Sequence, residues 1–214
     1  MNMIKCYNRF LAKPIFWLIH IVYPLAAIIL VVIMKEEILF SGLPKIFLGI
    51  MISTLVLSAE VLLDHWIFGG AFRKDSYNLE LIKCSPKGRT YWKNILIWDS
   101  LRRVISVFLI GILTFLFLYN NENKEIAEYE ILFYFTTSFF TFLCVYVCRF
   151  FQSPLTNMIF VYISLSSEMI VVWLLSQIQN MAVVISVIVL ADLALLTANY
   201  ITGMKVFERS YRDE

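Results

Sequence analysis

The sequence predicts an all-α polytopic membrane protein, a single domain over residues 1–214 with six transmembrane helices, an N-terminal interfacial helix and a short cytoplasmic helix. The chain is 60% hydrophobic with a mean hydropathy of +0.78, which exceeds the apolar share of a soluble domain. Its apolar residues gather in runs of about 20, the length needed to cross a bilayer. Its Lys and Arg residues lie almost entirely on one side of these runs, as in membrane proteins.

Residues 2–14 precede the first apolar run and separate into two faces on a helical wheel. Lys5, Arg9 and Lys13 share one face, and the opposite face is apolar, with Met3, Ile4, Tyr7, Phe10 and Leu11. This pattern predicts a helix in the membrane interface, with its cations toward water and anionic headgroups. Pro14 is expected to end this helix and let the chain turn into the bilayer.

Six apolar runs are the expected spans. Of the 18 Lys and Arg residues, only Lys35, Lys45 and Lys124 fall at the connections after the first, third and fifth runs, and the other 15 fall on the opposite side or at its edge. The positive-inside rule therefore predicts a cell-membrane protein with both termini in the cytoplasm and an acidic external loop at 120–130. The spans are expected at residues 15–34, 44–68, 95–119, 131–151, 154–175 and 181–204.

We single out four carboxylates inside the expected spans: Glu60, Asp64, Glu168 and Asp192. Intramembrane charge costs several kcal/mol and usually faces the protein interior. Each acid lies on a small or polar stripe at helical spacing. These stripes are Gly49, Ser53, Glu60 and Asp64 on the second span, Ser153, Asn157, Ser164 and Glu168 on the fifth, and Asp192, Asn199 and Gly203 on the sixth.

Carboxylates at successive depths predict a path for a cationic or amphipathic substrate, so these four residues are candidates for the substrate path. The alternative is structural. Arg102 or Arg103 enters the third span at about the depth of Asp64 and would pair with it. Glu168 and Asp192 would then be protonated and hydrogen-bonded to Ser or Asn side chains. For each of these acids taken singly, we favour the structural interpretation.

Several chemistries are not expected. The chain has no G-x-x-x-x-G-K-[ST] phosphate loop, no H-E-x-x-H and no G-x-S-x-G, and its net charge of +2 gives no field for nucleic acid. His20 and His65 lie on different helices, so no metal site and no catalytic residues are expected. Cys144 and Cys148, one turn apart, are interpreted as packing residues. If the protein performs energy-driven work, another polypeptide must supply the energy.

The cytoplasmic loop 73–94 is polar and basic. Asn78 suits a helix N-cap, Glu80 suits the positive end of a helix, and Leu79 and Ile82 fall on one face. Pro86 and the glycine that follows it two residues later then stop the helix. The loop therefore predicts a short amphipathic helix at the cytoplasmic mouth of the bundle.

This loop resembles the first intracellular loop of ABC-2-type transporter permeases. In that family a long second span ends in charged residues and is followed by a short helix, then by Ser-Pro and basic residues. The matching elements here are Leu79-Glu80-Leu81-Ile82, Ser85-Pro86 and Lys87-Gly88-Arg89. The basic N-terminal helix, the six spans and the short connection after the fourth span are similar to the family as well.

The resemblance implies that residues 78–85 form a coupling helix seated on a separate ATP-binding cassette ATPase. The ATP and Mg would be bound by that partner, and this chain would bind no cofactor. A second copy or a related permease would complete the membrane path. The connection 176–180 leaves almost no space for the re-entrant outer helices of the family, which argues against a large polysaccharide cargo. The coupling residues would be Asn78, Leu79, Glu80, Leu81, Ile82, Lys83 and Ser85.

The expected function is therefore an exporter permease that moves amphipathic or cationic peptides outward through the lipid membrane. Lipid or lipid-linked sugar is the alternative cargo. Two other classes stay open: a non-catalytic membrane immunity or sensor subunit, and an intramembrane cysteine peptidase that would use Cys84 activated by His65.

Overall fold

The computed structural model describes residues 3–41, 46–68, 82–118, 124–150, 153–178 and 180–209, and within these ranges all regular elements are helices. They are α1 (Met3–Phe10), α2 (Lys13–Trp17), a π-helix η1 (Leu18–Val22), α3 (Tyr23–Ser41), α4 (Ile46–Phe68), α6 (Gly88–Leu118), α7 (Lys124–Phe150), α8 (Pro154–Ser176) and α9 (Met181–Arg209).

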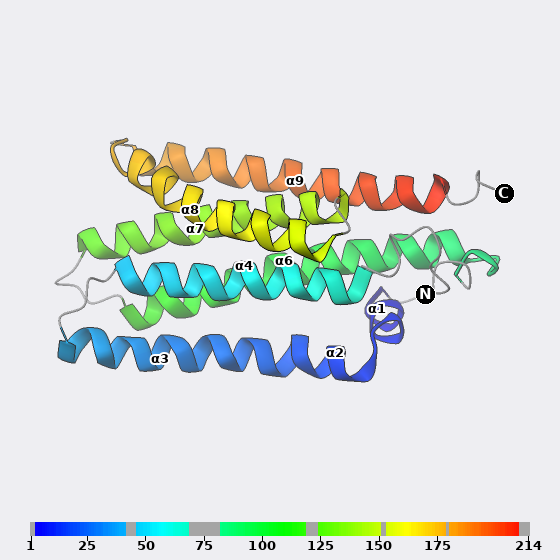
Figure 1. Ribbon diagram of the computed structural model, residues 1–214, viewed down its shortest axis with the longest axis horizontal. Coiled ribbons are helices and arrows are strands. Elements are labelled where there is room, and N and C mark those ends of the chain that lie inside the picture. The colour runs from blue at the N-terminus through cyan, green and yellow to red at the C-terminus, as the bar shows by residue number, and fades with distance from the viewer. Residues whose placement is uncertain are drawn as a thin grey trace.

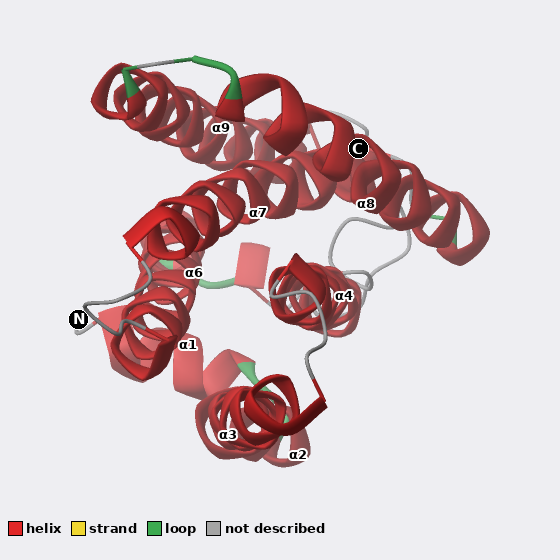
Figure 2. Ribbon diagram, turned by 90° about the vertical axis from the view of Figure 1, so that its left-hand side faces the viewer, coloured by secondary structure: helices red, strands yellow, loops and turns green. Residues whose placement is uncertain are grey.

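The long helices run up and down along one axis, and α1 lies at the same end as the C-terminal end of α9 (Figure 1). Viewed down this axis, α7 lies between α8 and α9 on one side and α4 and α6 on the other, with α2 and α3 beyond α4 and α6 (Figure 2). The contacts agree, because α7 packs against α4, α6, α8 and α9. α7 is therefore the central helix of the bundle.

Four stretches of the described residues are long and apolar enough to cross a membrane: Lys13–Leu30, Ile131–Arg149, Leu155–Ser176 and Met181–Glu208. In the stretch on α7, 61% of residues are buried inside the protein, against 11–17% in the other three, which fits its central place. α4 and α6 have 23 and 31 residues, and both carry charged side chains in their apolar runs.

The helix boundaries correct two expectations and confirm two others. α6 begins at Gly88, seven residues before the expected start at 95. Residues 88–94 of the expected loop 73–94 are therefore helical. α7 begins at Lys124, so residues 124–130 of the expected external loop 120–130 form the first turns of this helix. α8 and α9 keep the expected starts at Pro154 and Met181, and the connection between them is short as expected.

The first helix of the bundle contains a π-helical turn at Leu18–Val22. Pro24 explains it, because proline has no N–H to donate to the His20 carbonyl and its ring collides with that carbonyl in an α-helix. The chain widens instead, and the Tyr23 amide donates to the Leu18 carbonyl five residues back. His20 lies on the exposed side of this turn, where its ring stacks on Phe16 at 4.4 Å.

The N-terminal helix α1 has the expected faces, although its boundaries and contacts differ. It ends at Phe10, and Pro14 lies in the first turn of α2, where a missing N–H costs little. Part of its apolar face packs on α6, with Cys6 and Tyr7 fully buried, whereas Ile4 is 41% exposed. The Tyr91 hydroxyl of α6 donates to the Cys6 carbonyl at 2.9 Å.

An aromatic cluster joins four helices at this end of the bundle. Trp92 of α6 makes edge contacts with Phe10 and Phe68 and stacks on Phe207 of α9, all with ring centroids about 6 Å apart. Its indole N–H donates to the Gly203 carbonyl at 3.0 Å. Trp92, Phe68 and Phe207 are fully buried, so α1, α4, α6 and α9 share one core here.

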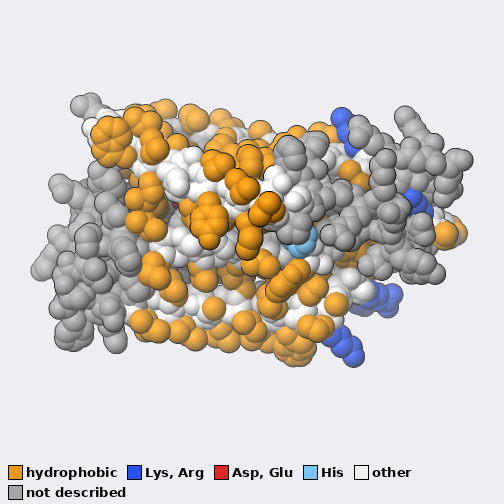
Figure 3. Space-filling model, viewed as in Figure 1, with side chains coloured by type: hydrophobic (Ala, Val, Ile, Leu, Met, Phe, Trp, Pro, Cys, Tyr) orange, Lys and Arg blue, Asp and Glu red, His pale blue; other side chains and the backbone are white. Residues whose placement is uncertain are grey.

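The outer surface of the bundle is apolar. Hydrophobic side chains cover the middle of the face seen in Figure 3, and the visible Lys and Arg side chains gather toward the end that holds α1. Large hydrophobic residues are more than half exposed on α8 and α9, as at Leu155, Tyr162 and Leu190. An exposed apolar belt of this kind fits a surrounding of lipid.

Candidate functional site

Six charged side chains meet in the core between α4, α6 and α7, and we name them the charge cluster. All are at most 6% exposed. Its members are Glu60 and Asp64 of α4, Asp99, Arg102 and Arg103 of α6, and Arg149 of α7. Three carboxylates face three guanidinium groups, so the cluster is formally neutral.

Arg102 and Arg103 bind the two acids of α4. The Arg102 guanidinium donates to both Glu60 carboxylate oxygens, at 3.1 and 2.9 Å, which is the bidentate geometry that suits arginine. Arg103 donates to Asp64 Oδ1 at 2.6 Å and to Glu60 Oε2 at 3.1 Å. The predicted pairing of Asp64 with one of the two arginines is therefore confirmed.

Arg149 and Asp99 complete the cluster. The Arg149 guanidinium donates to Asp64 Oδ1 at 2.7 Å and to Asp99 Oδ2 at 3.0 Å, and it lies 4.7 Å from the centre of the Phe68 ring. Asp99 also accepts a 2.9 Å bond from Arg103 Nε. Arg149 thus ties α7 to α4 and α6.

Tyr7 extends the cluster to the N-terminal helix. Its hydroxyl donates to Asp99 Oδ1 at 3.1 Å, and both groups are buried. Burial raises the pKa of the Tyr7 hydroxyl far above its ordinary value, so the group stays a neutral donor. α1 is therefore joined to the same network as α4, α6 and α7.

Glu168 lies in a separate polar site between α4, α7 and α8. Its carboxylate accepts hydrogen bonds from the hydroxyl of Ser53 and, at 2.6 Å, from that of Thr137. Glu168 is 1% exposed. One turn away along α8, the Ser164 hydroxyl accepts a hydrogen bond from the Cys144 thiol at 3.0 Å. The expected hydrogen bonding of Glu168 to neighbouring hydroxyls is observed.

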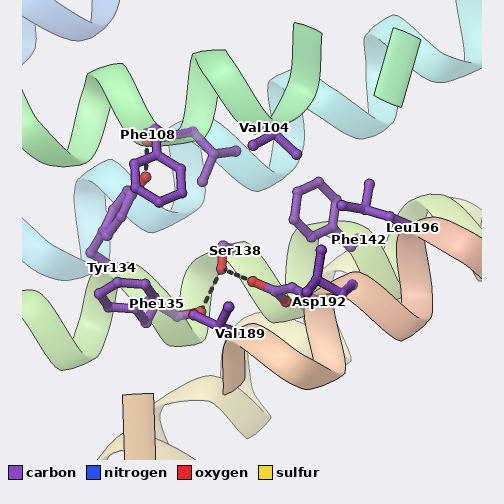
Figure 4. A pocket seen from close by; sticks show the side chains of 11 residues that line it. Val104, Phe108, Tyr134, Phe135, Ser138, Phe142, Val189, Asp192 and Leu196 are labelled. Atoms are coloured by element: carbon purple, nitrogen blue, oxygen red, sulfur yellow. Dashed lines mark hydrogen bonds between the residues drawn. The ribbon is translucent and has the colours of Figure 1, made fainter. Parts of the chain in front are cut away.

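Asp192 lies at an apolar pocket between α6, α7 and α9 (Figure 4). The Ser138 hydroxyl lies 2.5 Å from Asp192 Oδ2 and 2.8 Å from the Phe135 carbonyl. Asp192 Oδ1 is buried without a hydrogen-bond partner in the described part of the chain. The pocket has an empty volume of about 440 Å³, its open mouth included. The other lining residues are aliphatic or aromatic: Val104, Val107, Phe108, Tyr134, Phe135, Phe142, Val189, Leu193 and Leu196.

The coupling residues fall mostly outside the described residues. Asn78, Leu79, Glu80 and Leu81 belong to the stretch 69–81, whose structure is not described. Ile82 and Lys83 are helical and are followed by a turn, in which the Gly88 amide donates to the Ser85 carbonyl at 2.8 Å. A Cβ at Gly88 would collide with the Ile82 carbonyl, so only glycine lets α6 begin this close to the turn.

The four cysteines are free. Cys6, Cys144 and Cys148 are buried, which agrees with the packing interpretation of the last two. Cys84 is exposed in the turn before α6. His65 is part-buried near the end of α4, and the described residues contain no group of His, Cys, Asp and Glu able to hold a metal ion.

The four acids expected on the interior stripes are therefore all buried, but they do not form one chain of sites. Glu60 and Asp64 belong to the charge cluster, Glu168 is bonded to two hydroxyl groups in a site of its own, and Asp192 lies at a separate apolar pocket. Sequence reasoning missed Asp99 and Arg149. The signal for Asp99 was its spacing, because it lies three and four residues from Arg102 and Arg103, on the same face of α6.

Comparisons of the chain with protein-family models, with curated proteins and with solved structures found no match.

Proposed function

We propose that this chain is the membrane-spanning permease subunit of an ATP-binding cassette exporter, with six spans and a separate ATPase subunit. The observation that carries the proposal is the path of α6. One continuous helix begins directly after the coupling-like segment at Gly88 and continues through the charge cluster to the Asp192 pocket. A push on its first turn would reach both sites without crossing a loop.

The distribution of charge supports cytoplasmic placement of this end. Seven cations are exposed there on α1, on α2, near the start of α6 and near the end of α9: Lys5, Arg9, Lys13, Lys87, Arg89, Lys93 and Lys205. Cytoplasmic loops carry such an excess of Lys and Arg. In the proposed orientation, the segment 78–85 faces the compartment that holds ATP.

The charge cluster narrows the proposed substrate path. Glu60 and Asp64 are matched by arginines at 2.6–3.1 Å, so they offer no free negative charge to a cationic cargo. In the described residues, the hydrogen-bond partners of Glu168 and Asp192 are hydroxyl groups. We therefore assign the path to Glu168 and Asp192 and give Glu60 and Asp64 a structural role.

A second permease copy, or a related permease, would cover part of the apolar surface. α8 and α9 present many half-exposed large residues and only a small buried share. In a single bundle α7 occupies the centre, packed against α4, α6, α8 and α9, so the proposed path runs between two copies. The proposed cargo is an amphipathic or cationic peptide that moves outward along the shared surface.

The test is a pull-down of the tagged chain from its native membrane in mild detergent, with the subunits identified and ATPase activity assayed. We expect a stoichiometric ATP-binding partner that is lost when Leu79 and Ile82 are both changed to Asp. The matched control is Thr90→Asp with Lys93→Ser, which makes the same change of two charge units at exposed positions on α6. This control should keep the partner.

Two results would overturn the proposal. A clean preparation without an ATPase would favour the stand-alone immunity or sensor protein, which needs no nucleotide-binding partner. An ATPase that stays bound after both Asp substitutions would place the energy input elsewhere on the chain. Membrane insertion of each variant is checked by its sedimentation with the membrane fraction.

A further inference from the structure

We propose that the Asp192 pocket binds the ammonium group of an amphiphilic amine, which enters sideways from the bilayer with its apolar chain left along α6 and α9. This deepens the proposed transport function and rests on it for the role of the amine as cargo. The binding itself is a property of this chain alone.

The first argument is the unmatched oxygen. Asp192 is 9% exposed, its Oδ2 lies by the Ser138 hydroxyl, and its Oδ1 has no partner in the described part of the chain. A buried acceptor without a hydrogen-bond partner destabilises the protein, and more so when it is charged. A donor that enters the pocket removes this penalty. Because the unpartnered oxygen belongs to a carboxylate, a cationic N–H donor forms a stronger hydrogen bond with it than a neutral donor does.

The second argument is the lining. Apart from Asp192, Ser138 and Tyr134, it consists of aliphatic and aromatic side chains, and the Tyr134 hydroxyl is already bonded to the Val107 carbonyl. The pocket thus offers one anionic acceptor at an apolar wall. This chemistry selects one ammonium group on a hydrocarbon body and disfavours a polar sugar or a metal ion, which needs several oxygen ligands.

The third argument is the position of the mouth. Phe108 of α6 and Leu193 of α9 border the pocket and are 50% and 55% exposed. Both lie on the apolar outer surface, so the pocket opens toward lipid. The open mouth lets the head of an amphiphile enter while its hydrocarbon tail stays outside along the apolar surface.

Depth separates this ligand from a membrane phospholipid. Asp192 lies eleven residues into α9, which is about 16 Å along the axis at 1.5 Å per residue. That is close to the middle of a hydrocarbon core about 30 Å thick. An aminophospholipid keeps its ammonium group at the headgroup level, whereas a single-chain amine or a lysine of an apolar peptide can reach the pocket.

The experiment uses the purified chain in phosphatidylcholine nanodiscs and dodecylamine with a photoreactive diazirine in its chain. After irradiation, labelled peptides are identified by mass spectrometry. We expect labelling of the Phe108 and Leu193 segments, with a loss of at least tenfold in Asp192→Asn. Excess dodecylamine should compete, and dodecanol should not.

Two further variants control the result. Glu208→Gln removes an exposed acid of the same helix α9 outside the pocket and should leave labelling unchanged. Val189→Phe fills the pocket without changing charge and should abolish labelling. Normal size-exclusion profiles are required of every variant. Equal labelling of Asp192→Asn, or equal competition by dodecanol, would overturn the proposal and leave a groove for any hydrocarbon chain.

A final arm adds phosphatidylethanolamine to the nanodiscs. Loss of labelling would overturn the assignment to a single-chain amine or peptide in favour of a lipid headgroup; unchanged labelling supports it. The test is independent of the ATPase pull-down. Asp192-dependent labelling without an ATPase partner would support amine binding in the pocket and overturn the proposed transport function. An ATPase partner without Asp192-dependent labelling would overturn only the proposal of amine binding.

Discussion

The charge cluster should respond very differently to the loss of one partner and to the loss of a whole pair. Arg102→Met removes the bidentate partner of Glu60 and leaves three buried carboxylates facing two guanidinium groups. At an effective dielectric constant near 20, two unit charges about 4 Å apart interact by about 4 kcal/mol. Breaking one buried pair typically costs about 3–5 kcal/mol. We expect Arg102→Met to lower the free energy of unfolding by this amount.

The double variant Arg102→Met with Glu60→Gln restores the balance, with two carboxylates and two guanidinium groups. Replacing a buried ion pair by neutral groups of similar volume is often close to neutral in stability. We therefore expect the double variant to be more stable than Arg102→Met by at least about 2 kcal/mol. The assay is reversible unfolding by sodium dodecyl sulfate in mixed micelles, followed by tryptophan fluorescence.

The matched control is the exposed pair of Arg89 and Glu208, whose charged atoms lie 2.7 Å apart with side chains 73% and 47% exposed. Arg89→Met should change stability by less than about 1 kcal/mol, because water already solvates both charges. If Arg102→Met costs no more than Arg89→Met, or if the double variant is as unstable as the sum of the single variants, the reasoning about the buried charge balance is wrong.

Three further predictions concern single positions. Gly111→Val should cost about 1–3 kcal/mol in the same unfolding assay, because its Cβ would collide with the Tyr134 ring, whereas Ile112→Val on the exposed side of α6 should cost little. Glu168→Gln should change the free energy of unfolding by less than about 1 kcal/mol, since an amide can still bond to both neighbouring hydroxyls. Cys84→Ser should leave assembly with a partner and any export unchanged, as the thiol is exposed in a turn; loss of activity with intact assembly would revive the peptidase hypothesis.

Periodicity within a helix was enough to predict which acids face inward. Ser53, Glu60 and Asp64 repeat at intervals of four and seven, so they share one side of a helix wherever that helix is placed, and all three are buried. The same holds for Asn157, Ser164 and Glu168 on α8. This part of the candidate site follows from the chain alone, because intramembrane charge is costly on a lipid-facing side.

The partners of these acids were harder to predict because they depend on how neighbouring helices are rotated and ordered. Arg149 lies at the end of the expected fourth span, 131–151, and was given no partner, yet it binds Asp64, which lies 85 positions earlier in the chain. Asp99 was not counted among the intramembrane acids. Neither pairing has a local signal that says which helix lies opposite. The prediction that Pro14 ends the first helix was wrong, because proline is accepted in the first turn of a helix as readily as just after its end.

The ion pairs also indicate which helices move together. α6 is bound to α4 through Glu60 and to α7 through Arg149, so separating these three helices would expose several unmatched charges at once. α9 is joined to α6 near its C-terminal end, where the Gly203 carbonyl accepts the Trp92 hydrogen bond and Glu208 pairs with Arg89. We therefore expect conformational change to open α9 away from α6 on the outer side of Gly203, where the pocket lies.

Pulsed electron paramagnetic resonance can check this motion with spin labels on exposed positions. A label pair at Ile105 of α6 and Val187 of α9 should give a broad distance distribution that shifts on binding of an amine or a partner. A pair at Ile105 and Leu62 of α4 should stay narrow, because it reports on the rigid unit held by the charge cluster. Equal breadth for the two pairs would show that the ion pairs do not define the moving body, and the pocket would then have to open through side-chain motion alone.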